Sequence, residues 1–283
     1  MRSIYSRLFT FFFGIPPIIV CILLLPQAGH LALNILLITF TVIGALEISG
    51  LLNQKGIPVD LSLAITCAGI LPLSVYLEII AVTSVETTLI AVVVVFHAIL
   101  IRQLFGIKLA GTQGILMRTC ADMLVVVYPG FLMAYVAKIL TLPSPSTMFL
   151  IFIIIVFVND TGAYVFGMLF GRRNAGIFPL SPKKSVAGLI AGMGLSVGAA
   201  LVFFRFYPDQ FGHSLLFSII VGLCMSIVAV LGDLVESAFK RSAGTKDSGH
   251  VIPGRGGILD SIDSVIFCGP AFFLLMNYVV KVV

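Results

Sequence analysis

Long apolar runs alternate with short polar segments along almost the whole of this 283-residue chain. A helix that crosses the hydrocarbon core of a bilayer needs about 20 mainly apolar residues. The pattern therefore predicts an all-α protein, a polytopic helical bundle of about nine transmembrane helices. The expected spans are residues 8–26, 31–52, 61–80, 83–104, 119–140, 147–170, 186–206, 213–239 and 262–282.

The composition points to the same environment. Only 10% of the residues are charged, against roughly 25% in an ordinary soluble domain, and the mean hydropathy is +1.17. Too few polar side chains remain to cover a surface that faces water, so a soluble globular domain is excluded. A disordered chain is excluded as well, because such chains are poor in the large apolar residues that dominate here.

The basic residues indicate which side of the membrane each segment faces. Nine spans would place the two termini on opposite sides, and cytoplasmic segments carry an excess of Lys and Arg. With a cytoplasmic N-terminus, only Lys138, Arg205 and Lys281 of the 17 basic residues lie outside. We therefore expect a cytoplasmic N-terminus. The basic residues that give the chain a pI of about 9.0 are then explained by their position on the cytoplasmic side of the membrane. No nucleic-acid partner is expected.

Nearly half of all charged residues lie in two windows, 159–185 and 233–263, close to the cytoplasmic ends of the last four expected helices. The first half contributes isolated charges such as Glu47. This distribution predicts an N-terminal scaffold region, residues 1–145, and a C-terminal catalytic region, residues 146–283.

In the first window, Asp160 lies roughly 16 Å from the expected helix end. A carboxylate inside the membrane is costly and is a functional candidate, with a packing role as the alternative. Ser181 is expected to cap the next helix, with Lys183 and Lys184 in its first turn. Two lysines there oppose the helix dipole unless an anion binds. Alternatively, they contact anionic lipid headgroups.

In the second window, one helical face carries Asp233, Glu236, Ser237 and Lys240 at spacings i, i+3, i+4 and i+7. A glycine-rich loop over residues 242–257 follows. Carboxylate oxygens are the ligands that Mg²⁺ prefers, and lysines and arginines neutralise phosphates. The charges alone therefore suggest phosphate chemistry at a membrane surface.

Two aspartates, Asp260 and Asp263, then open the last expected helix. They share one face of it, and we expect them to cap its N-terminus.

The order of these motifs resembles a known family. The sequence SAFKR at 237–241, KD at 246–247 and PGRGGILDSID at 253–263 is similar to the signature of the phosphatidate cytidylyltransferases, or CDP-diacylglycerol synthases. Their pattern reads S-x-x-K-R, four residues, K-D, and then P-G-H-G-G-x-x-D-R-x-D. The segments 160–164 and 181–184 also resemble a motif of this family.

The resemblance, which covers roughly residues 157–268, implies a Mg²⁺-dependent nucleotidyltransferase of phospholipid biosynthesis. It would transfer the cytidylyl group of CTP to phosphatidic acid, forming CDP-diacylglycerol and pyrophosphate. It also implies a homodimer, and we expect residues 1–145 to be the dimerisation region. We expect an integral protein of a bacterial inner membrane whose active site faces the cytoplasm. Whether a second cation binds is left open.

The resemblance also implies roles for individual residues. Metal ligands would be Asp233, Asp260 and Asp263. Catalytic residues would be Lys246, Asp247, Asp260 and Asp263. Substrate-binding residues would be Asp160, Ser181, Lys183, Lys184, Ser237, Lys240, Arg241 and Arg255.

Three positions depart from the family pattern: Arg255 replaces its His, Ser261 its Arg and Ala187 its Glu. We hypothesise that the first two departures compensate each other: Arg255 would supply the guanidinium group that the family has at the position of Ser261. An inactive relative is one alternative, and a lipid-binding scaffold is another. The main rival is an ion-coupled transporter that uses the carboxylates of Glu47, Asp160 and Asp233.

Overall fold

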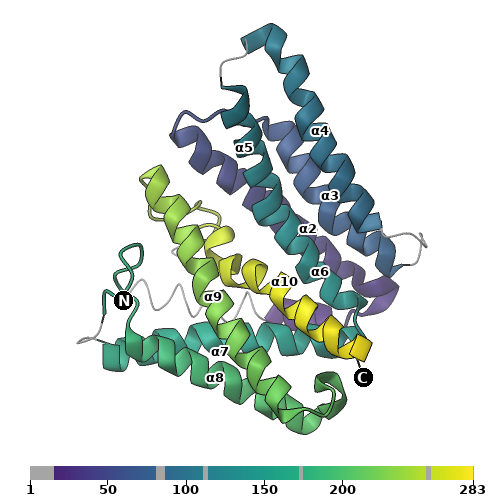
Figure 1. The fold of residues 1–283 in the computed structure, drawn as a ribbon, viewed down its shortest axis with the longest axis vertical. Coiled ribbons are helices and arrows are strands. Elements are labelled where there is room, and N and C mark those ends of the chain that lie inside the picture. Colours follow the sequence, from purple (N-terminus) through teal and green to yellow (C-terminus); the bar gives the residue numbers. More distant parts are fainter. Residues whose placement is uncertain (1–15, 81–86, 111–113, 172–174, 253–255, 283) are drawn as a thin grey trace. The chain divides into compact units, whose positions relative to one another are not determined.

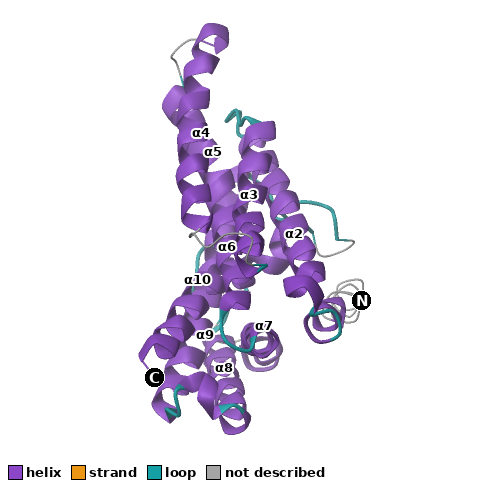
Figure 2. Ribbon diagram, turned by 90° about the vertical axis from the view of Figure 1, so that its right-hand side faces the viewer, coloured by secondary structure: helices purple, strands orange, loops and turns teal. Residues whose placement is uncertain are grey.

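The computed structural model describes residues 16–80, 87–110, 114–171, 175–252 and 256–282. Within these ranges the chain forms helices, turns and two isolated β-bridges, and no strand (Figure 2). Eight of the described helices are long and apolar enough to cross a membrane. The prediction of an all-α polytopic membrane protein is therefore confirmed. Of the first expected span, residues 16–23 are helical and residues 8–15 lie outside the described part.

The described chain divides into two compact units, and unit 1 comprises Met1–Thr141 and Ser242–Ser261. Its longer helices are α2 (Gln27–Gln54), α3 (Leu61–Ile79), α4 (Thr87–Ala110), α5 (Ile115–Val125) and α6 (Leu132–Lys138), shown from purple to teal in Figure 1. Helix α3 packs against α2 and α4.

One span of unit 1 changes its helical type along its length. Helices α5 and α6 are joined by a π-helical turn, η1 (Val126–Phe131), and are followed by a short 3₁₀ turn, η2 (Ile139–Thr141). Pro129 lies inside η1. Proline has no N–H to donate and its ring crowds the preceding turn, so the regular α-helical pattern is interrupted there.

Unit 2 comprises Leu142–Arg241 and Ile262–Val283. Its elements are α7 (Pro145–Phe170), α8 (Val186–Phe206), the 3₁₀ turn η4 (Pro208–Phe211), α9 (Leu215–Ala243) and α10 (Leu259–Val282). Helix α9 ends and α10 begins within the segment that belongs to unit 1. The sequence placed that segment in the C-terminal region, and the division of roles between the two halves stays a prediction.

Helices α7 and α8 lie side by side along much of their length (Figures 1 and 2). Small residues allow this approach: a Cβ added to Gly188 would lie 2.6 Å from the Ala163 carbonyl oxygen and 3.3 Å from the Gly167 Cα. Small residues on both helices thus let α7 and α8 pack closely.

Candidate functional site

Three carboxylates come together in unit 2. Asp233 and Glu236 lie one turn apart on α9, and Asp263 lies on α10. One carboxylate oxygen of each residue lies within 4.8 Å of the others. Glu236 is 0% exposed and Asp263 is 8% exposed. Three carboxylates held this closely, two of them buried, repel one another, and positive charge nearby stabilises their ionised forms.

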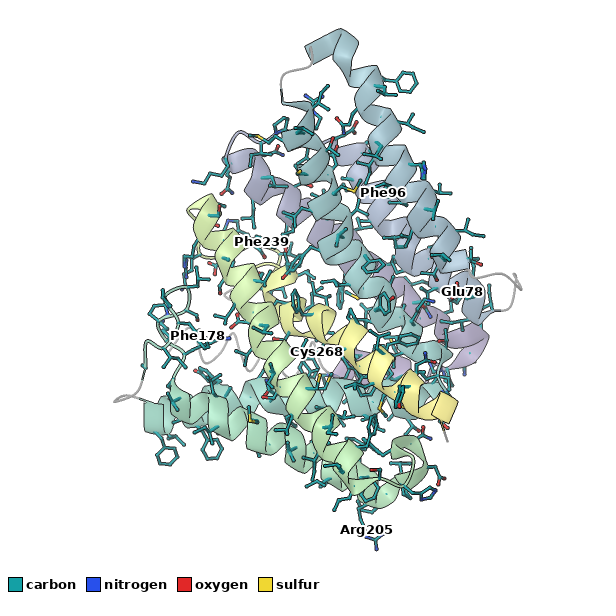
Figure 3. The ribbon with its side chains drawn as sticks, in the orientation of Figure 1. Glu78, Phe96, Phe178, Arg205, Phe239 and Cys268 are labelled. Carbon is teal, nitrogen blue, oxygen red and sulfur yellow. The ribbon has the colours of Figure 1, made fainter. Side chains whose placement is uncertain are left out.

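The approach of α10 to α9 depends on a small residue beside the cluster. A Cβ at Gly232 would lie 2.6 Å from the Phe267 Cβ and 3.0 Å from the Asp263 carbonyl oxygen. The same helix pair is in contact further along, where the Cys268 thiol donates to the Met225 carbonyl at 3.4 Å. Figure 3 shows Cys268 on α10 and Phe239 on α9. The carboxylates are thus carried by closely packed helices.

Two lysines neutralise part of this charge. The Lys184 Nζ lies 2.6 Å from the Asp233 Oδ2 and donates to the Val230 carbonyl oxygen at 3.4 Å. Lys240, one turn after Glu236 on α9, forms an ion pair with it. A donor set made only of carboxylate oxygens suits a hard cation such as Mg²⁺.

Lys184 is held by a turn that precedes α8. The Lys184 N–H donates to the Ser181 carbonyl oxygen at 3.0 Å, and α8 begins only at Val186. Its N-cap is Ser185, whose Oγ accepts the Gly188 N–H at 3.1 Å. The prediction that Ser181 caps the helix, with both lysines in its first turn, is therefore wrong. Serine followed by proline also begins β-turns, and here it begins one.

The remaining predicted residues of unit 2 lie on three different elements. Asp160 lies in α7, where its Oδ1 accepts the Asn159 amide at 3.1 Å; the Asn159 Oδ1 in turn accepts the Ser226 hydroxyl of α9 at 2.6 Å. Ser237 is buried one turn after Asp233. Two basic residues are exposed: Lys183 in the turn and Arg241 near the end of α9.

A second group of predicted residues lies in unit 1. The Asp260 Oδ2 accepts the Ser248 N–H at 2.8 Å, the Ser248 hydroxyl at 2.9 Å and the Gly257 N–H at 2.7 Å. Asp260 thereby ties the start of α10 to the loop before it. Its predicted role as a metal ligand stays a prediction, since the cluster of three carboxylates is formed with Glu236.

The predicted catalytic loop closes tightly around a glycine. Gly256 has a φ of +115°, and a Cβ there would lie 3.1 Å from the Asp247 Cβ and 2.5 Å from the Asp260 Oδ2. Only glycine fits between these two aspartates. Lys246 is exposed. Arg255 lies outside the described residues, so its proposed exchange with Ser261 stays a prediction.

Two carboxylates of the structure were not among the predicted site residues. Glu236 could have been identified as a ligand, because its i+3 spacing puts it on the same face as Asp233. Glu47 is different: it accepts hydrogen bonds from Ser248, Ile258 and Leu259. Nothing in the sequence around Glu47 indicates these partners.

The chain is similar in sequence to known proteins. The phosphatidate cytidylyltransferases of Staphylococcus saprophyticus subsp. saprophyticus and Staphylococcus haemolyticus are each 42% identical to the chain over 124 residues. That of Staphylococcus aureus is 41% identical over the same length. The matched segment is 44% of this chain and spans 46% of each relative. The model of the cytidylyltransferase family matches residues 5–279. Because that match covers nearly the whole length, the chain belongs to the cytidylyltransferase family.

Proposed function

We propose that the protein is a phosphatidate cytidylyltransferase, which transfers the cytidylyl group of CTP to phosphatidic acid and releases pyrophosphate. The observation that carries the proposal is the group of three carboxylates within 4.8 Å, Asp233, Glu236 and Asp263, paired with Lys184 and Lys240. In a membrane protein of the cytidylyltransferase family, such a site suits a polyphosphate substrate and a lipid acceptor. The name borne by the Staphylococcus relatives supports the same reaction.

In this reaction a phosphate oxygen of phosphatidic acid attacks the α-phosphorus of CTP. A new P–O bond forms while the bond from the α-phosphorus to the oxygen bridging the β-phosphorus breaks, and pyrophosphate leaves with that electron pair. A phosphomonoester carries a charge of roughly −1.5 to −2 at neutral pH, so its oxygen needs no general base. The main barrier is repulsion between two anions, which positive charge in the site must reduce.

The charged residues of unit 2 would reduce this repulsion. Asp233, Glu236 and Asp263 would hold Mg²⁺, because their oxygens match its ligand preference and are already close together. The bound ion would neutralise phosphate charge and stabilise the charge that develops on the leaving group. Lys184 and Lys240 lie against these carboxylates and would bind phosphate oxygens of the substrates.

We further propose that the site faces the cytoplasm of a bacterial inner membrane and that the protein is a homodimer. The orientation is supported by the asymmetry of the basic residues, of which 3 of 17 fall on the outer side. Chemical labelling of single cysteines introduced into the polar loops, in intact and opened cells, tests the orientation. Native mass spectrometry of the detergent-solubilised protein tests the dimer.

The transporter alternative is not supported. The family whose model matches the chain is one of transferases. Glu47, one of the three carboxylates that would have carried ions, instead binds backbone and hydroxyl groups of the 242–261 segment.

The reaction is tested with purified protein in detergent, labelled CTP, phosphatidic acid and Mg²⁺. We expect CDP-diacylglycerol and pyrophosphate in equal amounts, and no product after the metal is chelated. Absence of product with metal present would overturn the proposal. Asp260→Asn and Asp263→Asn should both abolish turnover. Loss of Mg²⁺ binding in Asp263→Asn but not in Asp260→Asn would assign Asp260 to the loop and not to the metal.

A further inference from the structure

Glu47 is a buried carboxylate with three hydrogen-bond donors around it. It lies on α2, seven residues before the helix ends at Gln54, and is 7% exposed. Its Oε1 accepts the Ile258 N–H at 2.9 Å, and its Oε2 accepts the Leu259 N–H at 2.8 Å. The Ser248 hydroxyl lies 3.0 Å from the same Oε2. Glu47 and its partners all belong to unit 1.

The two backbone donors are at the start of α10, which begins at Leu259. The first N–H groups of a helix have no partner within the helix, and negative charge is favourable at that end. The sequence assigned the capping of this helix to Asp260 and Asp263. Instead, the described structure pairs the N–H groups of Ile258 and Leu259 with Glu47, a residue of another helix.

The surrounding backbone is shaped to admit this carboxylate. A Cβ at Gly249 would lie 2.5 Å from the Glu47 Oε1, and a Cβ at Gly257 would lie 2.4 Å from its Oε2. Both distances are shorter than non-bonded atoms allow, so any side chain at either glycine would displace Glu47. The loop therefore combines donors for the carboxylate with the space that it needs.

Ser248 connects Glu47 to a predicted catalytic residue. Its Oγ lies 3.0 Å from the Glu47 Oε2 and 2.9 Å from the Asp260 Oδ2. A hydroxyl has one hydrogen and donates it to one acceptor at a time, so the two carboxylates share this donor. Ser248 also follows Lys246 and Asp247 directly in the sequence. Displacement of Glu47 would thus disturb Ser248, which contacts Asp260 and directly follows Asp247 in the chain.

A role in helix packing alone does not account for a carboxylate here. Burying a charged group is costly, and an apolar side chain would pack α2 without that cost. What the carboxylate adds is two fixed acceptor atoms for three donors. We infer that Glu47 is a positioning residue, which holds the loop and the start of α10 so that Lys246, Asp247 and Asp260 are presented for catalysis. This inference rests on the proposed function.

The test compares two substitutions of the same kind in the same unit. Glu47→Gln keeps the shape of the side chain but replaces one acceptor by a donor. Glu78→Gln is the matched control, because the Glu78 Oε1 also accepts a backbone N–H near the start of a helix, that of Thr88 in α4, at 2.6 Å. Helix α4 carries no predicted site residue. Glu78 is labelled in Figure 3 near the end of α3.

We expect Glu47→Gln to lower kcat for CDP-diacylglycerol formation at least ten-fold, with the KM for CTP within three-fold of the wild type. A positioning residue moves kcat in this way because it does not touch CTP. Glu78→Gln should keep kcat within two-fold. Glu47→Asp keeps the carboxylate but shortens the side chain by one methylene, so it should give an intermediate kcat. If Glu47→Gln does not fold, Glu47→Asp takes its place in the comparison.

Hydrogen exchange of the backbone amides in residues 248–261 is the second measurement, and it does not depend on activity. Glu47→Gln should accelerate exchange there at least ten-fold, and Glu78→Gln should not. If Glu47→Gln and Glu78→Gln match in both kcat and loop exchange, the inference is wrong. If the wild type forms no product, the proposed function fails. Loop exchange alone then decides whether Glu47 holds the loop, and unchanged exchange overturns that role.

Discussion

Replacing Lys184 by glutamine would separate the two roles that this residue has in our proposals. In the structure its ammonium group lies 2.6 Å from the Asp233 carboxylate; in the reaction it would bind phosphate. Mg²⁺ must compete with this ammonium group for Asp233. Without it, we expect Mg²⁺ to bind more tightly while CTP binds more weakly.

The size of the effect follows from how exposed the ion pair is. The Lys184 and Asp233 side chains are 21% and 34% exposed, so water screens their attraction substantially. Exposed pairs contribute up to about 1 kcal/mol, whereas losing one partner of a fully buried pair costs roughly 3–5 kcal/mol. We take about 1 kcal/mol for this pair. That corresponds to an increase in Mg²⁺ affinity of roughly five-fold.

Calorimetric titration of the nucleotide-free protein with Mg²⁺ measures this change. Lys183→Gln is the matched control, because Lys183 is exposed and makes no ion pair with the described residues. Both variants should raise the KM for CTP if both lysines bind phosphate. Only Lys184→Gln should tighten Mg²⁺ binding. Equal Mg²⁺ affinities in the two variants, or weaker binding in Lys184→Gln, would refute the competition.

Three further predictions concern the same unit. Glu236→Gln should weaken Mg²⁺ binding at least ten-fold in the same titration, because it removes one of the three clustered carboxylates; unchanged affinity would exclude Glu236 as a ligand. Gly188→Ala should destabilise the protein by about 1–3 kcal/mol in thermal unfolding, because the added Cβ meets the backbone of α7. A Cβ added at Gly194 meets open space, so Gly194→Ala should be neutral or slightly stabilising. Equal stability changes in Gly188→Ala and Gly194→Ala would contradict the packing argument. Ser185→Ala should lower stability by about 1 kcal/mol through loss of the α8 cap, and an unchanged melting temperature would contradict that role.

The membrane helices were predictable from sequence because apolar length is a local property. The expected span 186–206 coincides with α8, Val186–Phe206, and the span 61–80 differs from α3 by one residue at its end. Helix α9 continues to Ala243, four residues past the expected 239. Its last turns carry charged and hydroxyl groups, which a search for apolar windows excludes although they continue the same helix.

The candidate site was only partly predictable, because local signals there were ambiguous. A serine before a proline fits a helix cap and a turn equally well, and the choice between Ser181 and Ser185 depended on where the chain turned back. The face of α9 that carries Asp233 and Glu236 was correctly expected from spacing. Asp263 lies beside these two carboxylates only because α10 packs against α9. The spacing of residues within one helix cannot predict such a contact between helices.

Glu47 illustrates a general consequence of burial in a chain with few charges. In the interior of a membrane protein each charged or polar group needs a partner, so a carboxylate without polar neighbours in sequence implies donors far along the chain. The Glu47 donors are 201 residues or more away. Asp122, 0% exposed, follows the same logic: it accepts the Asp60 N–H and the Gln103 amide, both at 2.9 Å. An isolated carboxylate in an apolar helix therefore predicts hydrogen-bond donors from distant parts of the chain. In unit 1 one donor to Glu47, Ser248, belongs to the glycine-rich loop that carries predicted catalytic residues, and the other two, Ile258 and Leu259, directly follow that loop. Gly249 and Gly257 leave the space that the carboxylate requires.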